Sequence, residues 1–293
     1  MPAQAPTKSK LSILQSPRLQ KLSWLVHGCS TRVGGVSEAY GGHALNLGFT
    51  KHDVPSAVER NRALFLKKLG VDGKAPWPLI TLRQVHSDLI HRIDAGPERP
   101  PTGDGMVTDT PGVLLAIQTA DCLPILLVDP KARAIGAFHA GWRGTVKRIV
   151  EKGVGEMRRW FGSRPERLLA AIGPGIHACC YEVGEEVRAK FETQFKYAAE
   201  LFREVKESDS IHEKYPLLFL TARAPGHSEL PAKLFLDLVE GNRRQLLDAG
   251  VAAKNIAASP LCTSCRPDLL FSYRKEQGVT GRLLSVVGLR RAR

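Results

Sequence analysis

Three short apolar segments in the middle of the chain constrain the fold most strongly. They cover residues 112–118, 125–128 and 134–138, and each is too short to be a buried helix. The motif TADCLP (119–124) connects the first two segments, and HAGWRG (139–144) follows the third. The sequence therefore predicts buried strands whose ends carry polar groups toward a cleft.

The remaining chain alternates short apolar segments with stretches of helical periodicity. We predict further strands over residues 79–81, 86–93, 168–172 and 283–287, and helices over 54–69, 145–161, 181–191 and 231–249. Residues 33–48 are glycine-rich and predict a loop that approaches a ligand or another segment closely. This mixture favours an α+β fold with mixed β-sheets and surrounding helices. We expect a flexible arm over 1–10, one compact catalytic domain over 11–293, and a loop insertion over 200–231.

Three residues in the polar motifs are candidate metal ligands. His86 lies in RQVHSD, Cys122 in TADCLP and His139 in HAGWRG. Two imidazoles and one thiolate suit a tetrahedral zinc ion whose fourth position stays open for water or substrate. We therefore predict a catalytic metal site at these residues.

Other roles for these residues remain open at this level. Cys122 follows an apolar run and could belong to the core, because cysteine is among the most buried residue types. The neighbouring Asp121 favours a strand end at a cleft, since a carboxylate is costly to bury. His139 could be a hydrogen-bonded structural histidine, but Gly141 and Gly144 beside it suit a close approach of the backbone.

Anion-binding candidates lie in the same glycine-rich motifs. Arg143 follows His139, and Arg32 precedes the 33–48 loop. The passage from strand through glycine turn to helix at 134–161 predicts free backbone N–H groups near His139, which favour an anion. Asn46 could hydrogen-bond a sugar or phosphate, or could serve as a turn residue.

Composition indicates a globular protein. Of the 293 residues, 43% are hydrophobic and 24% charged, so the chain can form a substantial core. We predict a cytoplasmic protein without a membrane span, because no apolar run is long enough and the start MPAQAPTKSK lacks a secretory signal. Six cysteines in a chain of this length favour thiols or ligands over disulfides. We interpret the CxxC at Cys262 and Cys265, together with Cys179 and Cys180, as structural.

The charge balance is basic, with a net charge of +13 from 42 Lys and Arg against 29 Asp and Glu. Nucleic-acid binding is not favoured, because no helix-turn-helix, zinc-finger or aromatic RNA-binding pattern accompanies the charge. A basic surface that attracts phosphate or another anionic substrate is the preferred interpretation.

Several ordered motifs resemble one protein family over most of the chain. They are HGCSTRVGGVS (27–37), LNLG (45–48), QVH (84–86), TADCLP, HAGWRG, IGPGIHACCYEV (172–183), CTSC (262–265) and FSYRKEQGVTGR (271–282). In this set the chain resembles the YfiH or laccase-domain family, whose members are known as multicopper polyphenol oxidases and as purine nucleoside phosphorylases. Cys29 is a departure, because the family usually has an aromatic residue there.

The resemblance implies a specific activity. It implies phosphorolysis of adenosine, inosine and methylthioadenosine, with deamination of adenosine in addition. The partners would be a purine nucleoside and phosphate, and the cofactor zinc, with copper as the alternative.

Three other functions remain open. A copper polyphenol oxidase is disfavoured, because its centres need many histidines, commonly in HxH pairs, and this chain has nine His and no HxH. A cysteine hydrolase would use Cys122 as nucleophile and His139 as base. A peptidoglycan-precursor editing enzyme is a further possibility that the resemblance raises.

Overall fold

The protein is described here by a computed structural model that covers residues 10–73, 75–206 and 232–291. The chain divides into two compact units, Met1–His177 with Leu238–Arg293, and Ala178–Asp237. The arm expected over 1–10 lies outside the described residues, apart from Lys10. The expectation of one catalytic domain over 11–293 stays a prediction.

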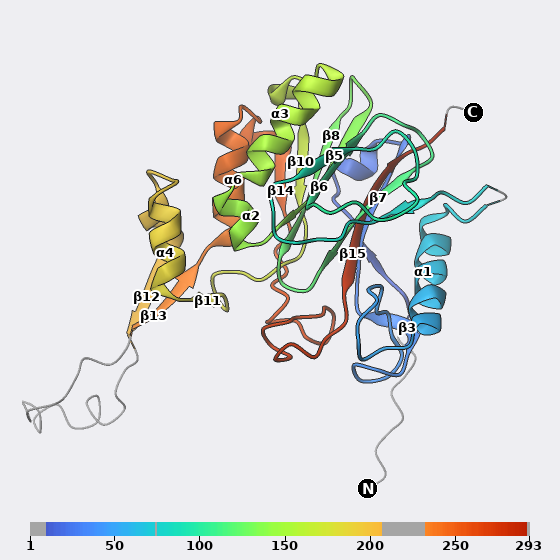
Figure 1. The fold of residues 1–293 in the computed structure, drawn as a ribbon, viewed down its shortest axis with the longest axis horizontal. Helices are drawn as coiled ribbons and strands as arrows, with labels where there is room; N and C mark the ends of the chain where they lie inside the picture. Colours follow the sequence, from blue (N-terminus) through green and yellow to red (C-terminus); the bar gives the residue numbers. More distant parts are fainter. Residues whose placement is uncertain (1–9, 74, 207–231, 292–293) are drawn as a thin grey trace, which may run out of the picture. The chain divides into compact units, whose positions relative to one another are not determined.

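The larger unit contains two β-sheets (Figure 1). The first has the order β1 (Ile13–Leu14), β2 (Leu25–Ser30), β15 (Leu283–Leu289), β7 (Leu114–Thr119) and β4 (Leu79–Ile80). The second has the order β14 (Ile256–Ala258), β10 (Leu169–Ile172), β8 (Leu123–Asp129), β9 (Ala134–Ala140), β6 (Gly105–Thr108) and β5 (Ile90–Arg92). Parallel pairs β4–β7, β5–β6 and β10–β14 occur among antiparallel ones, which confirms the α+β fold with mixed sheets.

Apolar side chains from the facing surfaces of the two sheets form the main core. Ile117 of β7 and Val287 of β15 belong to the same buried cluster as Leu126 of β8 and Ile135 of β9. Alternation along these strands sends every second side chain into this layer and the others to the outer faces. The central strands are therefore apolar on both faces, as the three predicted segments indicated.

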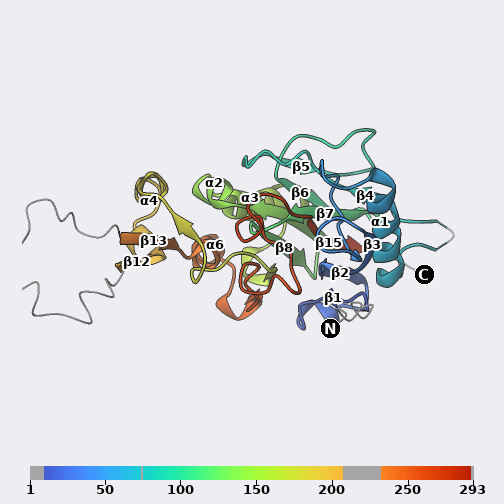
Figure 2. The ribbon, with the colours of Figure 1, turned by 90° about the horizontal axis from the view of Figure 1, so that it is seen from below.

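Helices cover the outer faces. Helix α1 (Pro55–Leu69) packs Phe65 on the first sheet, and α3 (Ile149–Phe161) lies against β9 of the second. Figures 1 and 2 show α1 and α3 on opposite sides of the paired sheets. The larger unit also contains β3 (Val33–Ser37), α2 (Trp142–Val146) and α6 (Leu238–Asp248). Among the described residues, none of the helices has the length and apolar character that crossing a membrane requires.

The smaller unit has a sheet of its own. Its strand order is β11 (Glu182–Val183), β13 (Ala232–Leu236) and β12 (Phe202–Lys206). Helix α4 (Glu185–Glu192) follows β11 in the chain. Part of the loop insertion expected over 200–231 is thus strand β12. Residues 207–231 of that insertion lie outside the described residues.

Most predicted elements are confirmed, although several have other bounds than predicted. The helix at 54–69 forms, with Pro55 in its first turn and Gly70 at φ +68° as its C-cap. The helices predicted over 181–191 and 231–249 are wrong at their starts, because 182–183 and 232–236 pair as strands. Long-range pairing overrides helical periodicity there.

Two further predictions need correction near the polar motifs. The helix predicted over 145–161 is interrupted at Arg148, which adopts φ +61° between α2 and α3. The strand predicted over 86–93 is reduced to Ile90–Arg92, because His86 has φ +58° and cannot continue a strand.

Helix α3 allows a matched test of packing. A Cβ added at Gly153 would lie 2.5 Å from two ring carbons of Phe138, whereas one added at Gly155 would meet nothing within 4 Å. We expect Gly153→Ala to lower the free energy of unfolding by about 1 kcal/mol or more, because overpacking exceeds the gain in helix propensity. Gly155→Ala should raise it by about 0.5–1 kcal/mol. Urea unfolding measures both, and equal stabilisation by the two variants would contradict the packing described here.

Candidate metal centre

The three residues predicted as ligands converge. His86 lies in the loop before β5, Cys122 directly precedes β8, and His139 lies in β9, yet their ligand atoms are all within 4.8 Å of one another. The Cys122 Sγ to His86 Nε2 distance is 3.8 Å. In a tetrahedral zinc site with bonds of about 2.0–2.3 Å, neighbouring ligand atoms are roughly 3.5 Å apart. The arrangement is therefore close to what one metal ion requires.

Strand register brings two of the ligands together. In the antiparallel pair β8–β9, Leu123 lies opposite Ala140 and Pro124 opposite His139. Cys122, one residue before the start of β8, therefore lies beside the end of β9 that carries His139. The imidazole rings of His86 and His139 are 4.8 Å apart at an angle of 71°.

Gly141 keeps this centre open. A Cβ at this position would lie 2.7 Å from Cys122 Sγ, which is closer than real Cβ atoms approach, and 3.1 Å from His86 Cδ2, which is a tight contact. The close backbone approach predicted from HAGWRG therefore occurs, and it occurs against the ligands themselves.

Asp104 organises the centre and was not identified from the sequence. Its fully buried carboxylate accepts hydrogen bonds from His139 Nδ1 at 2.8 Å and from Ser87 Oγ at 2.7 Å. It also accepts the backbone N–H groups of Val85, His86 and Ser87 at 2.6–3.2 Å. One carboxylate thus fixes both histidines, and the only sequence signal was an Asp between two glycines before a strand.

The bond to Asp104 also sets the tautomer of His139. A carboxylate accepts a hydrogen bond from Nδ1–H, so Nε2 is the nitrogen left to face the other ligands. Burial would raise the pKa of Asp104, but the hydrogen bonds from His139 and Ser87 outweigh it and hold that pKa well below its usual value. Asp104 is therefore ionised at neutral pH.

Cys122 and His139 shift one another's protonation. Burial would raise the pKa of the Cys122 thiol, yet His139 and His86 outweigh burial and lower it. Burial would lower the pKa of His139, yet the Cys122 thiolate and Asp104 raise it. The two shifts describe a single thiolate–imidazolium pair, and a thiolate is the form of cysteine that binds metals and acts as a nucleophile.

Asp121 holds the turn that presents Cys122. Its backbone has φ +96°, an uncommon conformation for a residue other than glycine. The side chain accepts hydrogen bonds from Thr263 Oγ1 at 2.6 Å and from the Arg274 backbone at 2.7 Å. Asp121 is 8% exposed, so it does not face solvent at a cleft as the sequence suggested, but its burial is compensated by these bonds.

Arg143 is a cation close in sequence to His139. It is an exposed residue of α2, and its guanidinium stacks 4.4 Å from the Trp142 ring. Among the described residues it has no ion-pair partner. Its position four residues after His139, with an unpaired charge, is compatible with the predicted anion role.

Arg32 has structural contacts that the sequence did not indicate. Nη1 donates to the Pro267 carbonyl at 2.7 Å and to Glu276 Oε1 at 3.0 Å, and Nη2 donates to the Tyr40 carbonyl at 2.9 Å. The guanidinium also lies 4.7 Å from the Phe271 ring. Arg32 therefore joins the 33–48 loop to the 266–276 segment, and its predicted role toward phosphate stays a prediction.

Asn46 and Cys262 also lie in structural surroundings. Asn46 is fully buried, donates to Asp53 Oδ2 at 2.7 Å and accepts the Arg282 backbone N–H at 2.8 Å. These bonds fit the turn-residue alternative, and a contact between Asn46 and substrate stays a prediction. Cys262 is buried, and its Sγ accepts the His177 backbone N–H at 3.4 Å.

Similar proteins share both the sequence and the fold. The family described as multi-copper polyphenol oxidoreductase laccase matches residues 26–290. A Deinococcus radiodurans protein named purine nucleoside phosphorylase is 40% identical, with 97% of this chain and 96% of that protein covered. The Escherichia coli protein named purine nucleoside phosphorylase YfiH is 32% identical, with 96% and 99% covered.

Solved structures agree with this relationship. The Bacillus licheniformis protein YfiH superposes with a TM-score of 0.77 at 32% identity, covering 92% of this chain and 94% of that one. YlmD from Geobacillus stearothermophilus gives 0.75 at 31% identity, with 94% of each chain covered. The chain therefore belongs to the family described as multi-copper polyphenol oxidoreductase laccase, and it has the fold of the YfiH and YlmD proteins.

Proposed function

We propose that this protein is a zinc-dependent purine nucleoside phosphorylase that acts on adenosine, inosine and methylthioadenosine and also deaminates adenosine. The observation that carries the proposal is the convergence of His86, Cys122 and His139 within 4.8 Å. The names of relatives up to 40% identical over nearly the whole chain supply the substrate class. A cytoplasmic location and the absence of membrane or nucleic-acid partners remain part of the same prediction.

The three donors fit zinc better than a multicopper centre. One thiolate and two imidazoles form a three-ligand set with room for a fourth, as catalytic zinc sites have. When bound, the ion supplies a Lewis acid with an open coordination position. In the described residues, the only other group of potential ligands of this kind contains cysteines alone, so nothing supplies the many histidines that a multicopper oxidase needs.

The residues around the centre have separate roles in this proposal. Asp104 keeps Nδ1 of His139 protonated, so Nε2 is free to bind the metal. Arg143 presents a planar guanidinium suited to two phosphate oxygens. In phosphorolysis a phosphate oxygen forms a bond to C1′ of the ribose while the C1′–N9 bond breaks, and the electron pair leaves on N9 of the base, which takes up a proton. Deamination is a separate reaction, in which water adds at C6 and ammonia leaves.

One observation favours a second candidate. The lowered pKa of Cys122 and the raised pKa of His139 give a thiolate–imidazolium pair, the arrangement of a cysteine hydrolase. In that case Cys122 attacks a carbonyl and His139 protonates the leaving group. Metal content separates the two candidates, because a nucleophilic Cys122 must be free of metal.

The first test concerns zinc stoichiometry. We expect about one zinc per chain in the purified protein and its loss in Cys122→Ala, because only two neutral ligands remain. Asp104→Asn should weaken zinc binding by about 10–100-fold, since it removes the charged partner of a ligand histidine. His52→Ala, at an exposed histidine, is the control and should keep its zinc. Elemental analysis and a chelator titration measure these effects, and stoichiometric zinc in Cys122→Ala would disprove the ligand assignment.

The second test concerns phosphate. Arg143→Ala should raise the KM for phosphate roughly 10–100-fold with little change in zinc content, because a charge-assisted contact contributes about 1.5–3 kcal/mol. Lys147→Ala removes the same charge from an exposed side chain four residues later and should change the KM less than about twofold. Equal effects of the two variants would mean that only net charge matters. Arg32→Ala in the same assay tests the remaining prediction for Arg32.

The third test is the reaction. The zinc-loaded protein should convert adenosine and phosphate to adenine and ribose 1-phosphate, and should form inosine from adenosine when phosphate is absent. Chromatography of the products distinguishes the two, and added copper should not be required. If neither adenine nor inosine forms, the proposal is wrong. Phenol oxidation with added copper would then support the polyphenol oxidase, and activity on a muropeptide nucleotide would support the peptidoglycan-precursor editing enzyme.

A further inference from the structure

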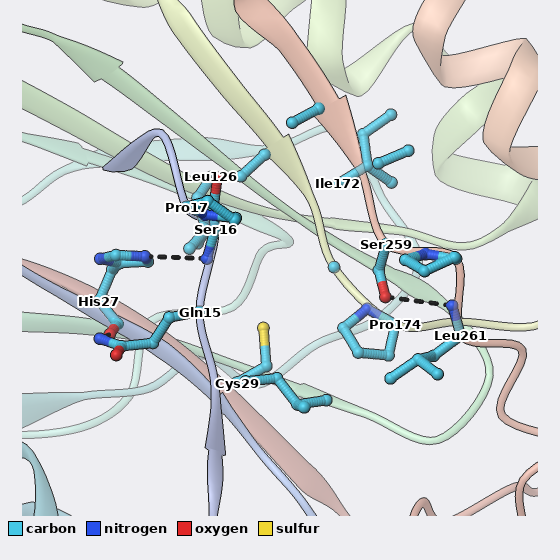
Figure 3. A pocket seen from close by; sticks show the side chains of 16 residues that line it. Gln15, Ser16, Pro17, His27, Cys29, Leu126, Ile172, Pro174, Ser259 and Leu261 are labelled. Carbon is cyan, nitrogen blue, oxygen red and sulfur yellow. Dashed lines mark hydrogen bonds between the residues drawn. The ribbon is translucent and has the colours of Figure 1, made fainter. Parts of the chain in front are cut away.

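A pocket of about 320 Å³ lies in the larger unit (Figure 3). Residues 14–17 and β2 form one side, and β8, β10 and residues 257–261 form the other. Its lining contains no Asp, Glu, Lys or Arg and none of the three candidate metal ligands. Neither α2 nor α6 lines it, so the pocket is separate from the contacts that hold the metal centre in place.

Helix α2 lies against the candidate ligands and is too short to hold its own position. It has five residues and is followed by Arg148 at φ +61°. Its N-cap is Gly141, where an added Cβ would lie 2.7 Å from Cys122 Sγ and 3.1 Å from His86 Cδ2. A helix of this length does not persist by itself in water, so contacts with other elements must fix Gly141.

Thr145 connects Gly141 to the rest of α2. The backbone N–H of Thr145 and its hydroxyl both donate to the Gly141 carbonyl, at 2.9 and 3.0 Å. Thr145 is fully buried. Because Oγ1 gives its only hydrogen to Gly141, any further hydrogen bond at this atom must be one that it accepts.

Two side chains of α6 hold Thr145. Asn242 Nδ2 donates to Thr145 Oγ1 at 3.0 Å, and Gln245 Nε2 donates to the Thr145 carbonyl at 2.8 Å. Both side chains are fully buried on one face of α6, which packs against α2 and α3 (Figure 1). The orientation of the Asn242 amide is fixed, because Nδ2 also lies 2.8 Å from the Leu238 carbonyl, which can only accept.

The N–H groups distinguish these two residues from apolar ones. No described group donates a hydrogen bond to Asn242 Oδ1 or Gln245 Oε1. Leucine at either position would fill a similar volume without an amide oxygen to satisfy. What the amides add is therefore their donated hydrogen bonds, and both residues donate to Thr145.

We propose that Asn242 is a positioning residue of the metal centre and that it acts through the Thr145 hydroxyl. The contacts run from Asn242 Nδ2 to Thr145 Oγ1, from Oγ1 to the Gly141 carbonyl, and from Gly141 to two of the candidate ligands. Loss of the first bond leaves the hydroxyl free to rotate, so Gly141 is held less firmly beside the ligands. This role rests on the metal site of the proposed function but not on its reaction.

Thr145 supplies a matched pair of variants. Thr145→Val keeps the shape of the side chain and removes Oγ1, whereas Thr145→Ser keeps Oγ1. In the purified full-length protein, Thr145→Val should weaken zinc binding about 10-fold in a chelator competition, because contacts outside the ligand set contribute roughly 10–100-fold to metal affinity. Thr145→Ser should stay within about threefold of the wild type, since the hydrogen bonds are kept. The visible absorption of bound cobalt(II), which reports ligand geometry, should change in Thr145→Val alone.

A double variant tests whether Asn242 acts through Thr145. Asn242→Leu should weaken zinc binding about as much as Thr145→Val, because both remove the same contact. Combining them should weaken binding less than about twofold beyond either single variant, since changes at one contact do not add.

Asn61→Leu is the control for a general loss of stability. Asn61 is also a fully buried amide, and its Nδ2 donates three hydrogen bonds, none of them to α2 or to a candidate ligand. Asn61→Leu should lower the free energy of unfolding at least as much as Asn242→Leu. It should leave the zinc affinity and the cobalt(II) spectrum unchanged.

Crystal structures of the Thr145 pair supply a measurement that needs no metal. Relative to Cys122 Sγ, Gly141 should shift by more than about 0.5 Å in Thr145→Val and keep its place in Thr145→Ser. This comparison decides the role of Asn242 even if the wild type binds no zinc and the zinc-dependent function is wrong. It also decides if Asn242→Leu does not fold.

Several results would overturn the proposal. They are equal zinc affinity of Thr145→Val and Thr145→Ser, additive losses in the double variant, an equal loss of zinc affinity in Asn61→Leu, or an unmoved Gly141 in the crystal structure of Thr145→Val.

Discussion

The candidate metal centre depends on the carboxylate of Asp104 more than on any other group. A buried carboxylate is tolerated only when hydrogen bonds replace its hydration, and here three backbone N–H groups, a serine hydroxyl and an imidazole do so. The same bonds connect the loop of His86 to strand β9, which carries His139. Two ligands from distant parts of the chain are thus fixed by one acceptor, which explains how they converge without a local motif.

The backbone around the ligands is held in conformations that residues other than glycine seldom adopt. His86 has φ +58° and Asp121, beside Cys122, has φ +96°. Each such residue costs roughly 1–3 kcal/mol, so the surrounding bonds must compensate. They do so through Asp104 at the first position and through Thr263 and Arg274 at the second. Two of the three ligands are therefore presented by turns that the rest of the fold stabilises.

The sequence was sufficient where local signals and tertiary structure agree. The apolar segments at 112–118, 125–128 and 134–138 form β7, β8 and β9, and the three candidate ligands predicted from separate motifs lie close together. The sequence was insufficient where the hydrogen-bond partners are distant along the chain. The sequence around Asp104 does not indicate that its carboxylate accepts hydrogen bonds from residues 85–87 and 139. The sequence around Arg32 likewise does not indicate Pro267 and Glu276 as its partners. For the same reason residues 232–236 read as helix but pair as a strand.

The space beside β8 is filled differently at the start of the strand and farther along it. At the start of the strand, Cys122 lies beside His139, where Gly141 leaves room for the ligands. Farther along, Leu126 joins the core and also lines the pocket. Pro124 lies between these two positions along the chain, and a Cβ at Gly173 would lie 2.7 Å from its ring and 3.1 Å from Cys29 Sγ. Small residues at 29, 141 and 173 thus set how much room remains beside each part of the strand.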